Sequence, residues 1–219
     1  MTLLDSALAL AQKGFRVFPL APLSKQPIFS SYHQKSTTDP DKIRGWWQHK
    51  TRIKNYNVGV HLPGILVVDI DGPVGEESFE LLTQDHPCQP TAEVSTGSGR
   101  HLYYRLPAGV RAVPRPLDVV EGFEHLDRID IKGSGGLVAG PGSLHKSGTT
   151  YAWTTEPATA ADLTPAPAWM IQHLCGPEQP KYLQEIGGDT EIEEANSDRI
   201  LLETCLVRWP FVAKEGAKR

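Results

Sequence analysis

Hydrophobic and polar positions along the chain predict many short strands interspersed with a few helices. Apolar residues recur at helical spacing over residues 2–13, and Gly14 is the expected end of that helix. Further helices are expected over residues 39–47, 74–85 and 166–175. Alternating or continuous apolar runs predict strands over residues 15–20, 57–62, 65–71, 91–96, 100–106, 128–132, 137–139 and 151–153. Gly and Pro are plentiful and favour turns, so the pattern predicts a strand-rich α+β fold.

Two local features of this pattern carry specific expectations. Pro63-Gly64 separates strands 57–62 and 65–71, and this turn signal predicts a hairpin of neighbouring strands. Trp46 and Trp47 end the second helix, and we interpret the pair as core packing rather than as a platform on which bases stack.

The chain is expected to divide into three parts. Residues 1–175 form a domain, and the polar, Pro- and Gly-containing residues 176–189 are typical of a linker. Residues 190–219 begin a short helical region that is too small to be a domain by itself. We therefore interpret the chain as a piece of a longer protein.

Composition narrows the class of protein. The net charge of −4 gives no general sign of nucleic-acid binding, which would require local clusters of Lys and Arg. The three cysteines form no CxxC pair and have no zinc-ligand spacing, so no zinc is expected. No signal pattern or membrane-spanning apolar run is present, which predicts a cytoplasmic protein without a membrane partner.

The first group of candidate functional residues lies at the end of strand 65–71. Side chains alternate across a strand, so Asp69 and Asp71 share one face while Ile70 points to the other. Two neighbouring carboxylates repel each other unless a cation lies between them, and hard oxygen ligands suit Mg²⁺ or Mn²⁺. The alternative is an ordinary strand end with two solvated acids.

A second group follows a glycine-rich turn. His101, Tyr103 and Arg105 share one face of strand 100–106, and Ser98 and Arg100 lie at its start. A polar, basic face behind small residues suits a phosphate group, because backbone N–H groups can approach the anion. The alternative is a histidine that is hydrogen-bonded in the core or at the surface.

A third group is the strand Arg128–Lys132. Ile129 and Ile131 are expected to face the core, so that Arg128, Asp130 and Lys132 project together. Asp130 could be a third carboxylate and Lys132 a triphosphate ligand. The alternative is an amphipathic strand with a salt-bridged acid.

Taken together, the three groups indicate nucleotidyl transfer. Carboxylates that hold two metal ions can activate an attacking hydroxyl and stabilise pyrophosphate, and nearby cations can neutralise a triphosphate. Motifs of other enzyme classes are not supported. A dinucleotide-binding fingerprint is excluded because neither Gly97-x-Gly99 nor Gly133-x-Gly135 opens a helix after a strand, and no Walker or Gly-x-Ser-x-Gly motif is present.

The ordered motifs resemble the bifunctional primase–polymerase (Prim-Pol) domain of the archaeo-eukaryotic primase superfamily, which occurs in phage and plasmid replication proteins. They are Asp-Ile-Asp at 69–71, Ser-Thr-Gly-Ser-Gly-Arg-His at 95–101 and Ile-Asp-Ile-Lys-Gly-Ser-Gly-Gly at 129–136. The resemblance covers roughly residues 5–155 and implies an RRM-like mixed or antiparallel sheet with flanking helices.

The resemblance also implies roles for individual residues. Asp69, Asp71 and Asp130 match the metal-binding catalytic acids of the family, and His101 matches a histidine that holds the phosphate of the incoming nucleotide. Residues at triphosphate-contact or recurrent nucleotide-site positions are Ser98, Arg100, Lys132, Lys25 and His145. The family often has glycine where this chain has Arg100, which either adds a phosphate contact or shifts the turn.

The implied activity is template-dependent synthesis of DNA and of primers on single-stranded DNA, from nucleoside triphosphates and with Mg²⁺ or Mn²⁺. The implied partners are the template, the primer and a helicase domain on the same longer polypeptide. One alternative is a rolling-circle replication nuclease, for which Tyr103 and Tyr104 are available although its His-hydrophobe-His pattern is absent. Another is a non-catalytic nucleic-acid-binding module of a replication complex.

Overall fold

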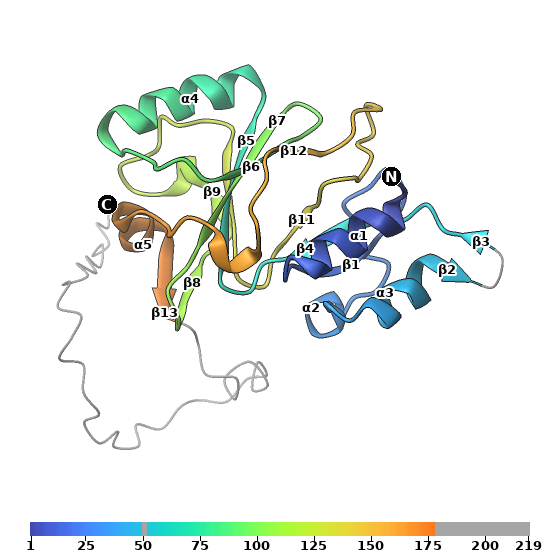
Figure 1. Ribbon diagram of the computed structural model, residues 1–219. Helices are drawn as coiled ribbons and strands as arrows, with labels where there is room; N and C mark the ends of the chain where they lie inside the picture. The colour runs from blue at the N-terminus through green and yellow to red at the C-terminus, as the bar shows by residue number, and fades with distance from the viewer. Residues whose placement is uncertain (50–51, 178–219) are drawn as a thin grey trace, which may run out of the picture. The chain divides into compact units, whose positions relative to one another are not determined.

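The computed structural model describes residues 1–49 and 52–177, and its largest element is a six-stranded antiparallel sheet (Figure 1). The strand order is β12-β6-β7-β5-β10-β9. The bounds of these strands are β5 Ile65–Asp71, β6 Ala92–Ser95, β7 Gly99–Arg105, β9 Arg115–Pro116, β10 Ile129–Lys132 and β12 Ala152–Thr155. Its central strands β5 and β7 are rich in β-branched and aromatic residues, which pack well on a pleated surface.

A second, three-stranded antiparallel sheet has the order β1-β4-β11. Its strands are β1 Arg16–Leu20, β4 Asn57–His61 and β11 Leu137–Ala139. Helices α1 (Leu3–Gln12) and α3 (Pro40–Trp47) contact this sheet. Both helices begin as the sequence predicts, because Thr2 forms a capping box with Asp5 and Asp39 caps the helix that opens with Pro40.

The remaining elements are short, apart from α4 (Gly72–Asp85), which contacts β5, β7 and β10. They are α2 Tyr32–Lys35, α5 Ala168–Leu174, the strand pair β2 Gln48–His49 and β3 Arg52–Ile53, the strand pair β8 Val110–Ala112 and β13 Cys175–Pro177, and two 3₁₀ helices, Leu117–Val119 and Ala160–Asp162. No helix in the described part of the chain is both long and apolar enough to cross a membrane.

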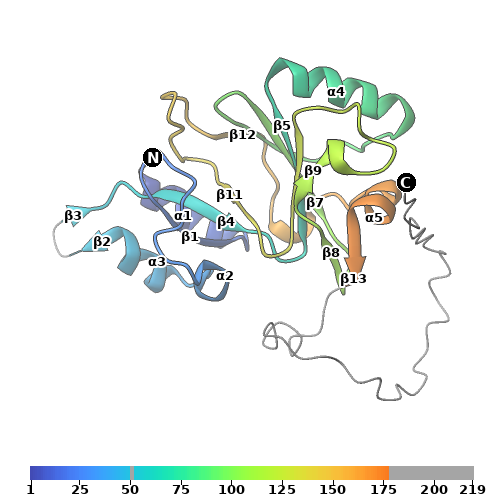
Figure 2. The same ribbon diagram turned by 180° about the vertical axis from the view of Figure 1, so that it is seen from behind.

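The six-stranded sheet is buried on both faces by two hydrophobic clusters. The first cluster includes Val67 and Tyr103 and joins this sheet to the three-stranded sheet. The second cluster includes Leu66 and Tyr104 and joins the opposite face to α4 and α5. Figures 1 and 2 show α4 on one side of the six-stranded sheet and the three-stranded sheet on the other. The described residues belong to one compact unit, Met1–Glu178.

The fold confirms the α+β class and corrects several local predictions. Strands β4 and β5 do not form a hairpin, because Gly64 (φ +67°) lets the chain pass from one sheet into the other. Residues 107–127, for which the apolar pattern predicts no helix or strand, contain β8, β9 and the 3₁₀ helix Leu117–Val119. The chain at 175–177 pairs with β8 where a linker was expected to begin. The rest of that linker and the C-terminal helical region lie outside the described residues.

Candidate nucleotide and metal site

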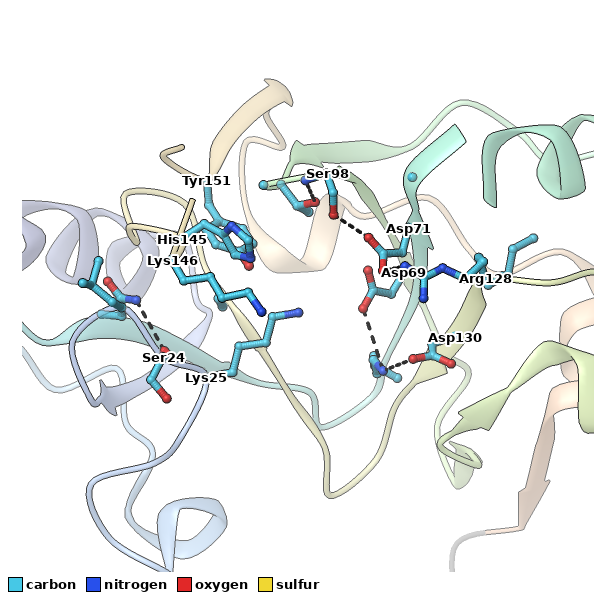
Figure 3. Close-up of a pocket in the computed structure, with 18 of the residues that line it drawn as sticks. Ser24, Lys25, Asp69, Asp71, Ser98, Arg128, Asp130, His145, Lys146 and Tyr151 are labelled. Atoms are coloured by element: carbon cyan, nitrogen blue, oxygen red, sulfur yellow. Dashed lines mark hydrogen bonds and ion pairs between the residues drawn. The ribbon is translucent and has the colours of Figure 1, made fainter. Parts of the chain in front are cut away.

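An open pocket of about 840 Å³ lies where polar side chains of β5 and β10 meet loops next to the three-stranded sheet. Figure 3 shows the three acids on one wall, with Arg128 beside them, and Lys25, His145 and Lys146 on the other wall. Of the predicted site residues, those lining the pocket are Lys25, Asp69, Asp71, Ser98, Asp130, Lys132 and His145. His101 and Arg100 are not part of its lining.

The three predicted catalytic acids lie on one face of the six-stranded sheet. Asp69 and Asp71 alternate with the buried Ile70 on β5. Asp130 on β10 is the register partner of Asp69, so its side chain points to the same side. The alternation predicted from the sequence is therefore present in the structure, with Ile129 and Ile131 buried on the opposite face.

Each acid has a cationic neighbour. Asp71 accepts a hydrogen bond from Arg128 Nη2 at 2.6 Å and another from Ser98 Oγ at 2.5 Å. Lys132 Nζ lies 2.6 Å from Asp130 Oδ2 and 3.8 Å from Asp69 Oδ2. These contacts neutralise acids that would otherwise repel one another at the sheet edge.

The acids have the chemistry of a hard-cation site. Within residues 1–49 and 52–177, no group of three or more His, Cys, Asp or Glu side chains is close enough to hold a metal ion with the side chains as they stand. However, Asp69, Asp71 and Asp130 supply carboxylate oxygens to one pocket, and such oxygens are the ligands that Mg²⁺ and Mn²⁺ prefer. The residues therefore fit a divalent cation, provided that Lys132 and Arg128 turn away from the acids.

Asp69 is the most enclosed of the three acids, with 13% of its side chain exposed. Burial acts to raise its pKa, but contact with His101 and the charges of His101, Lys25 and Lys132 outweigh burial and hold the pKa below its usual range. The carboxylate is thus ionised at neutral pH and available as a ligand.

His101 lies beneath Asp69 and has no exposed surface. Its Nε2 is 3.3 Å from Asp69 Oδ1, without the alignment of a regular hydrogen bond, and neither ring nitrogen has a hydrogen-bond partner in the described part of the chain. Register explains the position, because His101 on β7 is opposite Asp69 on β5. In this conformation His101 contacts the acid rather than the open pocket where a nucleotide phosphate would lie.

The wall opposite the acids is basic. Lys25 and Lys146 extend toward the acids from two loops, and His145 and Tyr151 lie beside Lys146 (Figure 3). Burial, with a smaller effect from the charges of Asp69 and Asp71, raises the pKa of Tyr151 to about 12. Tyr151 therefore keeps its hydroxyl proton at neutral pH and can donate a hydrogen bond into the pocket.

Buried polar contacts hold the loop that carries His145 and Lys146. Asn57 Nδ2 donates to the backbone oxygen of Leu144 at 2.8 Å, and the Leu144 N–H donates to Asn57 Oδ1 at 2.9 Å. The buried Ser143 hydroxyl exchanges hydrogen bonds with the backbone of Val58. These contacts fix the loop to β4 at the mouth of the pocket.

Arg100 does not lie at this pocket, contrary to the sequence prediction. Its guanidinium binds both carboxylate oxygens of Glu76 and one oxygen of Glu93, and it lies 5.0 Å from the centre of the Phe79 ring. Strand alternation is the reason, because Arg100 and His101 are consecutive residues of β7 and must point to opposite faces.

Lys146 is a pocket residue that the sequence analysis did not name, and Arg128, which strand alternation grouped with Asp130 and Lys132, was given no role there. Arg128 has a left-handed backbone (φ +62°) immediately before β10, and this turn directs its side chain to Asp71. Lys146 follows His145 in a loop, where no periodicity indicates direction. Only the position of its loop at the pocket identifies Lys146.

The sequence of this chain was compared with profiles of known protein families. The sequence profile described as "Bifunctional DNA primase/polymerase, N-terminal" (Prim-Pol) matches residues 7–169, which include every residue of the pocket described above. A comparison with curated proteins gave no match. Because the matched region covers most of the chain and contains the ordered acidic, glycine-rich and basic segments, this chain belongs to the bifunctional DNA primase/polymerase (Prim-Pol) family.

Proposed function

We propose that this chain is a template-dependent nucleotidyltransferase that extends and initiates DNA chains on a single-stranded template. Membership of the Prim-Pol family supports a primase/polymerase-type function in replication. The proposal adds a two-metal mechanism, nucleoside triphosphate substrates and a phage or plasmid setting. A helicase domain on the same longer polypeptide is also part of the proposal.

The separation of charge across one pocket is the observation that carries this proposal. Three carboxylates share one face of the sheet, while Lys25 and Lys146 face them from the opposite wall. A nucleoside triphosphate with its metal ions requires both kinds of group, since acids bind the cations and basic side chains bind the phosphates. A surface that only binds nucleic acid has no need of three acids directed to one place.

The residues then have distinct roles. Asp69, Asp71 and Asp130 would hold the divalent cations, which lower the pKa of an attacking 3′-hydroxyl and neutralise charge on pyrophosphate. Arg128 and Lys132 pair with Asp71 and Asp130 in this structure, and with cations held by the acids both would be available to triphosphate oxygens. Ser98, Lys25 and His145 border the same space and orient the triphosphate.

His101 acts as a positioning residue in this proposal. It contacts Asp69 from the buried side and holds that carboxylate at the pocket surface. This role replaces the direct phosphate contact inferred from sequence, because the ring has no exposed surface through which to reach a nucleotide.

The experiment that tests the proposal is primer extension with a primed single-stranded template, labelled dNTPs and Mn²⁺. Asp69→Asn/Asp71→Asn should lower the rate roughly a hundredfold or more, since metal ions contribute several kcal/mol to such reactions. The matched control is Asp85→Asn/Asp127→Asn, which removes the same charge from two exposed positions outside the pocket. Wild-type rates in the Asp69/Asp71 variant would refute the assigned site.

The structure does not support the alternative of a rolling-circle replication nuclease. Tyr103 and Tyr104 are each 1% exposed, and burial raises the pKa of both hydroxyl groups. A nucleophile for DNA must reach the phosphodiester and lose its proton, and neither tyrosine is placed to do so. A covalent adduct between the protein and DNA in the same assay would restore this alternative.

A further inference from the structure

A second concave surface, which we call the α2–α3 groove, lies outside the acidic pocket. Its volume is about 640 Å³. It is formed by the chain around α2 and by the exposed side of α3 (Figure 1). The lining residues that matter for the argument are Ile28, Phe29, Lys35, Lys42, Trp46 and Lys54.

Trp46 gives the groove a partly exposed aromatic surface. The neighbouring Trp47 is fully buried in the first cluster, so the core-packing interpretation of the Trp pair holds for Trp47. Trp46 instead packs against that cluster with one side and lines the groove with the other. Its ring centre is 5.6 Å from that of Phe29, which fixes the orientation of the indole.

The charge around this aromatic surface is positive. Among the residues that the structure describes, three lysines and no acidic side chain line the groove. Lys35 Nζ lies 4.9 Å from the centre of the Phe29 ring. The nearest acid recorded for Lys42 is Asp39, at 3.9 Å, and the Lys42 side chain is 67% exposed. An exposed pair at this distance is weak and leaves the ammonium available to another anion.

We propose that the α2–α3 groove binds single-stranded DNA. A base would stack on Trp46, and Lys35, Lys42 and Lys54 would contact the flanking phosphates. Aromatic side chains beside dispersed cations are the general requirement for binding single strands without sequence preference, because every base has a face that stacks. The paired bases of a duplex leave no such face free.

The groove also lies close to the acidic pocket along the chain. Lys25 lines the pocket, and Ile28 and Phe29 line the groove. Three peptide units separate Lys25 from Ile28, so their Cα atoms are at most about 11 Å apart. The groove and the pocket therefore share one short loop, and in this proposal a strand bound in the groove continues into the pocket as template. That last step rests on the proposed function, whereas binding in the groove does not.

Fluorescence anisotropy with a labelled 20-nucleotide oligo(dT) tests the groove directly. The full-length protein is used in EDTA without nucleotides, so that the result is independent of polymerase activity. Trp46→Leu, which retains an apolar side chain but no aromatic face, should weaken binding about tenfold, and Trp46→Phe should restore most of it. Thermal melting of each variant checks that the fold is intact.

The salt dependence of binding supplies a second, charge-specific measurement. Lys35→Ser/Lys42→Ser should reduce the slope of log K against log salt by about 1.4, because each lost phosphate contact on a single strand removes about 0.7. The control is Arg105→Ser/Arg111→Ser, which removes the same charge at positions that line neither the groove nor the pocket.

Three outcomes would overturn the proposal. One is wild-type affinity in Trp46→Leu together with an unchanged salt slope in the lysine variant. Another is an equal change of slope in the arginine control, which would indicate a general charge effect. The third is a Trp46-dependent affinity for polyglutamate that exceeds the affinity for oligo(dT), which would make an acidic protein segment the occupant. Loss of polymerase activity in Asp69→Asn/Asp71→Asn with unchanged oligo(dT) binding would support two separate functions.

Discussion

At the scale of single residues, the relation between Asp69 and His101 explains how an acid stays ionised in a half-closed site. The ring is fully buried and lies 3.3 Å from the Asp69 carboxylate, and neither ring nitrogen has a hydrogen-bond partner within residues 1–49 and 52–177. Groups that contact a metal-binding carboxylate from behind fix its orientation and its basicity. His101 therefore differs in position from Lys25 and Lys146, since it contacts Asp69 from the buried side while the two lysines line the open pocket.

This separation predicts a specific kinetic result for His101→Gln. Glutamine keeps a polar group near Asp69 but loses the ring that orients the carboxylate. We expect the Mn²⁺ concentration for half-maximal primer extension to rise about tenfold to a hundredfold, as for other residues behind metal ligands. The KM for dNTP, measured at saturating Mn²⁺, should change little.

The control for this measurement is His125→Gln, which alters an exposed histidine outside the pocket. A rise in the dNTP KM of His101→Gln with an unchanged Mn²⁺ requirement would contradict the positioning role. It would favour instead the direct phosphate contact that the family resemblance implies.

At the scale of elements, the acids depend on the close approach of β5 and β7. Gly99 on β7 is the register partner of Asp71. A Cβ atom at residue 99 would lie 1.9 Å from the backbone oxygen of Ile70, which is far inside van der Waals contact. The glycine is required there because backbone, rather than a flexible side chain, occupies the space.

Gly99→Ala should therefore lower the free energy of unfolding by about 1–3 kcal/mol, the usual cost of overpacking. Gly45→Ala is the matched substitution, and we expect it to raise the free energy of unfolding, because of where Gly45 lies. It lies within α3 with no neighbour near its added Cβ, and alanine should stabilise the helix by about 0.5–1 kcal/mol. Urea unfolding monitored by circular dichroism measures both changes. Equal effects of the two substitutions would show that the β5–β7 approach is not the cause.

Strand alternation made the acidic half of the site predictable from sequence. Asp69 and Asp71 flank the buried Ile70, and Asp130 lies between the buried Ile129 and Ile131. A period of two therefore fixes the common face of the three acids once the strands pair. The same alternation directs the side chains of Arg100 and His101 to opposite faces of the sheet. The prediction that placed both at the phosphate site did not apply this rule to the pair. The family resemblance assigned Arg100 to the triphosphate site. On β7 its side chain points to the face opposite that of His101, where it binds Glu76 and Glu93.

At the scale of the whole molecule, the sequence does not reveal what covers each face of the sheet. Strand 100–106 was expected to present a polar, basic face, but Tyr103 is buried in the first cluster because the three-stranded sheet packs against it. That contact joins segments distant in sequence, which local periodicity does not encode. Lys146 on the basic wall was missed for the same reason, since it comes from a loop that is hydrogen-bonded to Asn57, whereas Lys25 and His145 on that wall were named only through the family resemblance.

The extent of the domain remains a prediction, and truncation tests it. A chain that ends at Glu178 keeps both hydrophobic clusters and should unfold at the same urea concentration as the full chain. A chain that ends at Leu163 loses α5 and β13, and with them Met170 and Leu174, which are fully buried in the second cluster. Each such side chain contributes about 1.5–3 kcal/mol through burial, so the shorter chain should lose several kcal/mol or fail to fold. A lower midpoint for the chain ending at Glu178 would show that residues beyond 178 stabilise the catalytic unit, and the boundary expected near residue 175 would then be wrong.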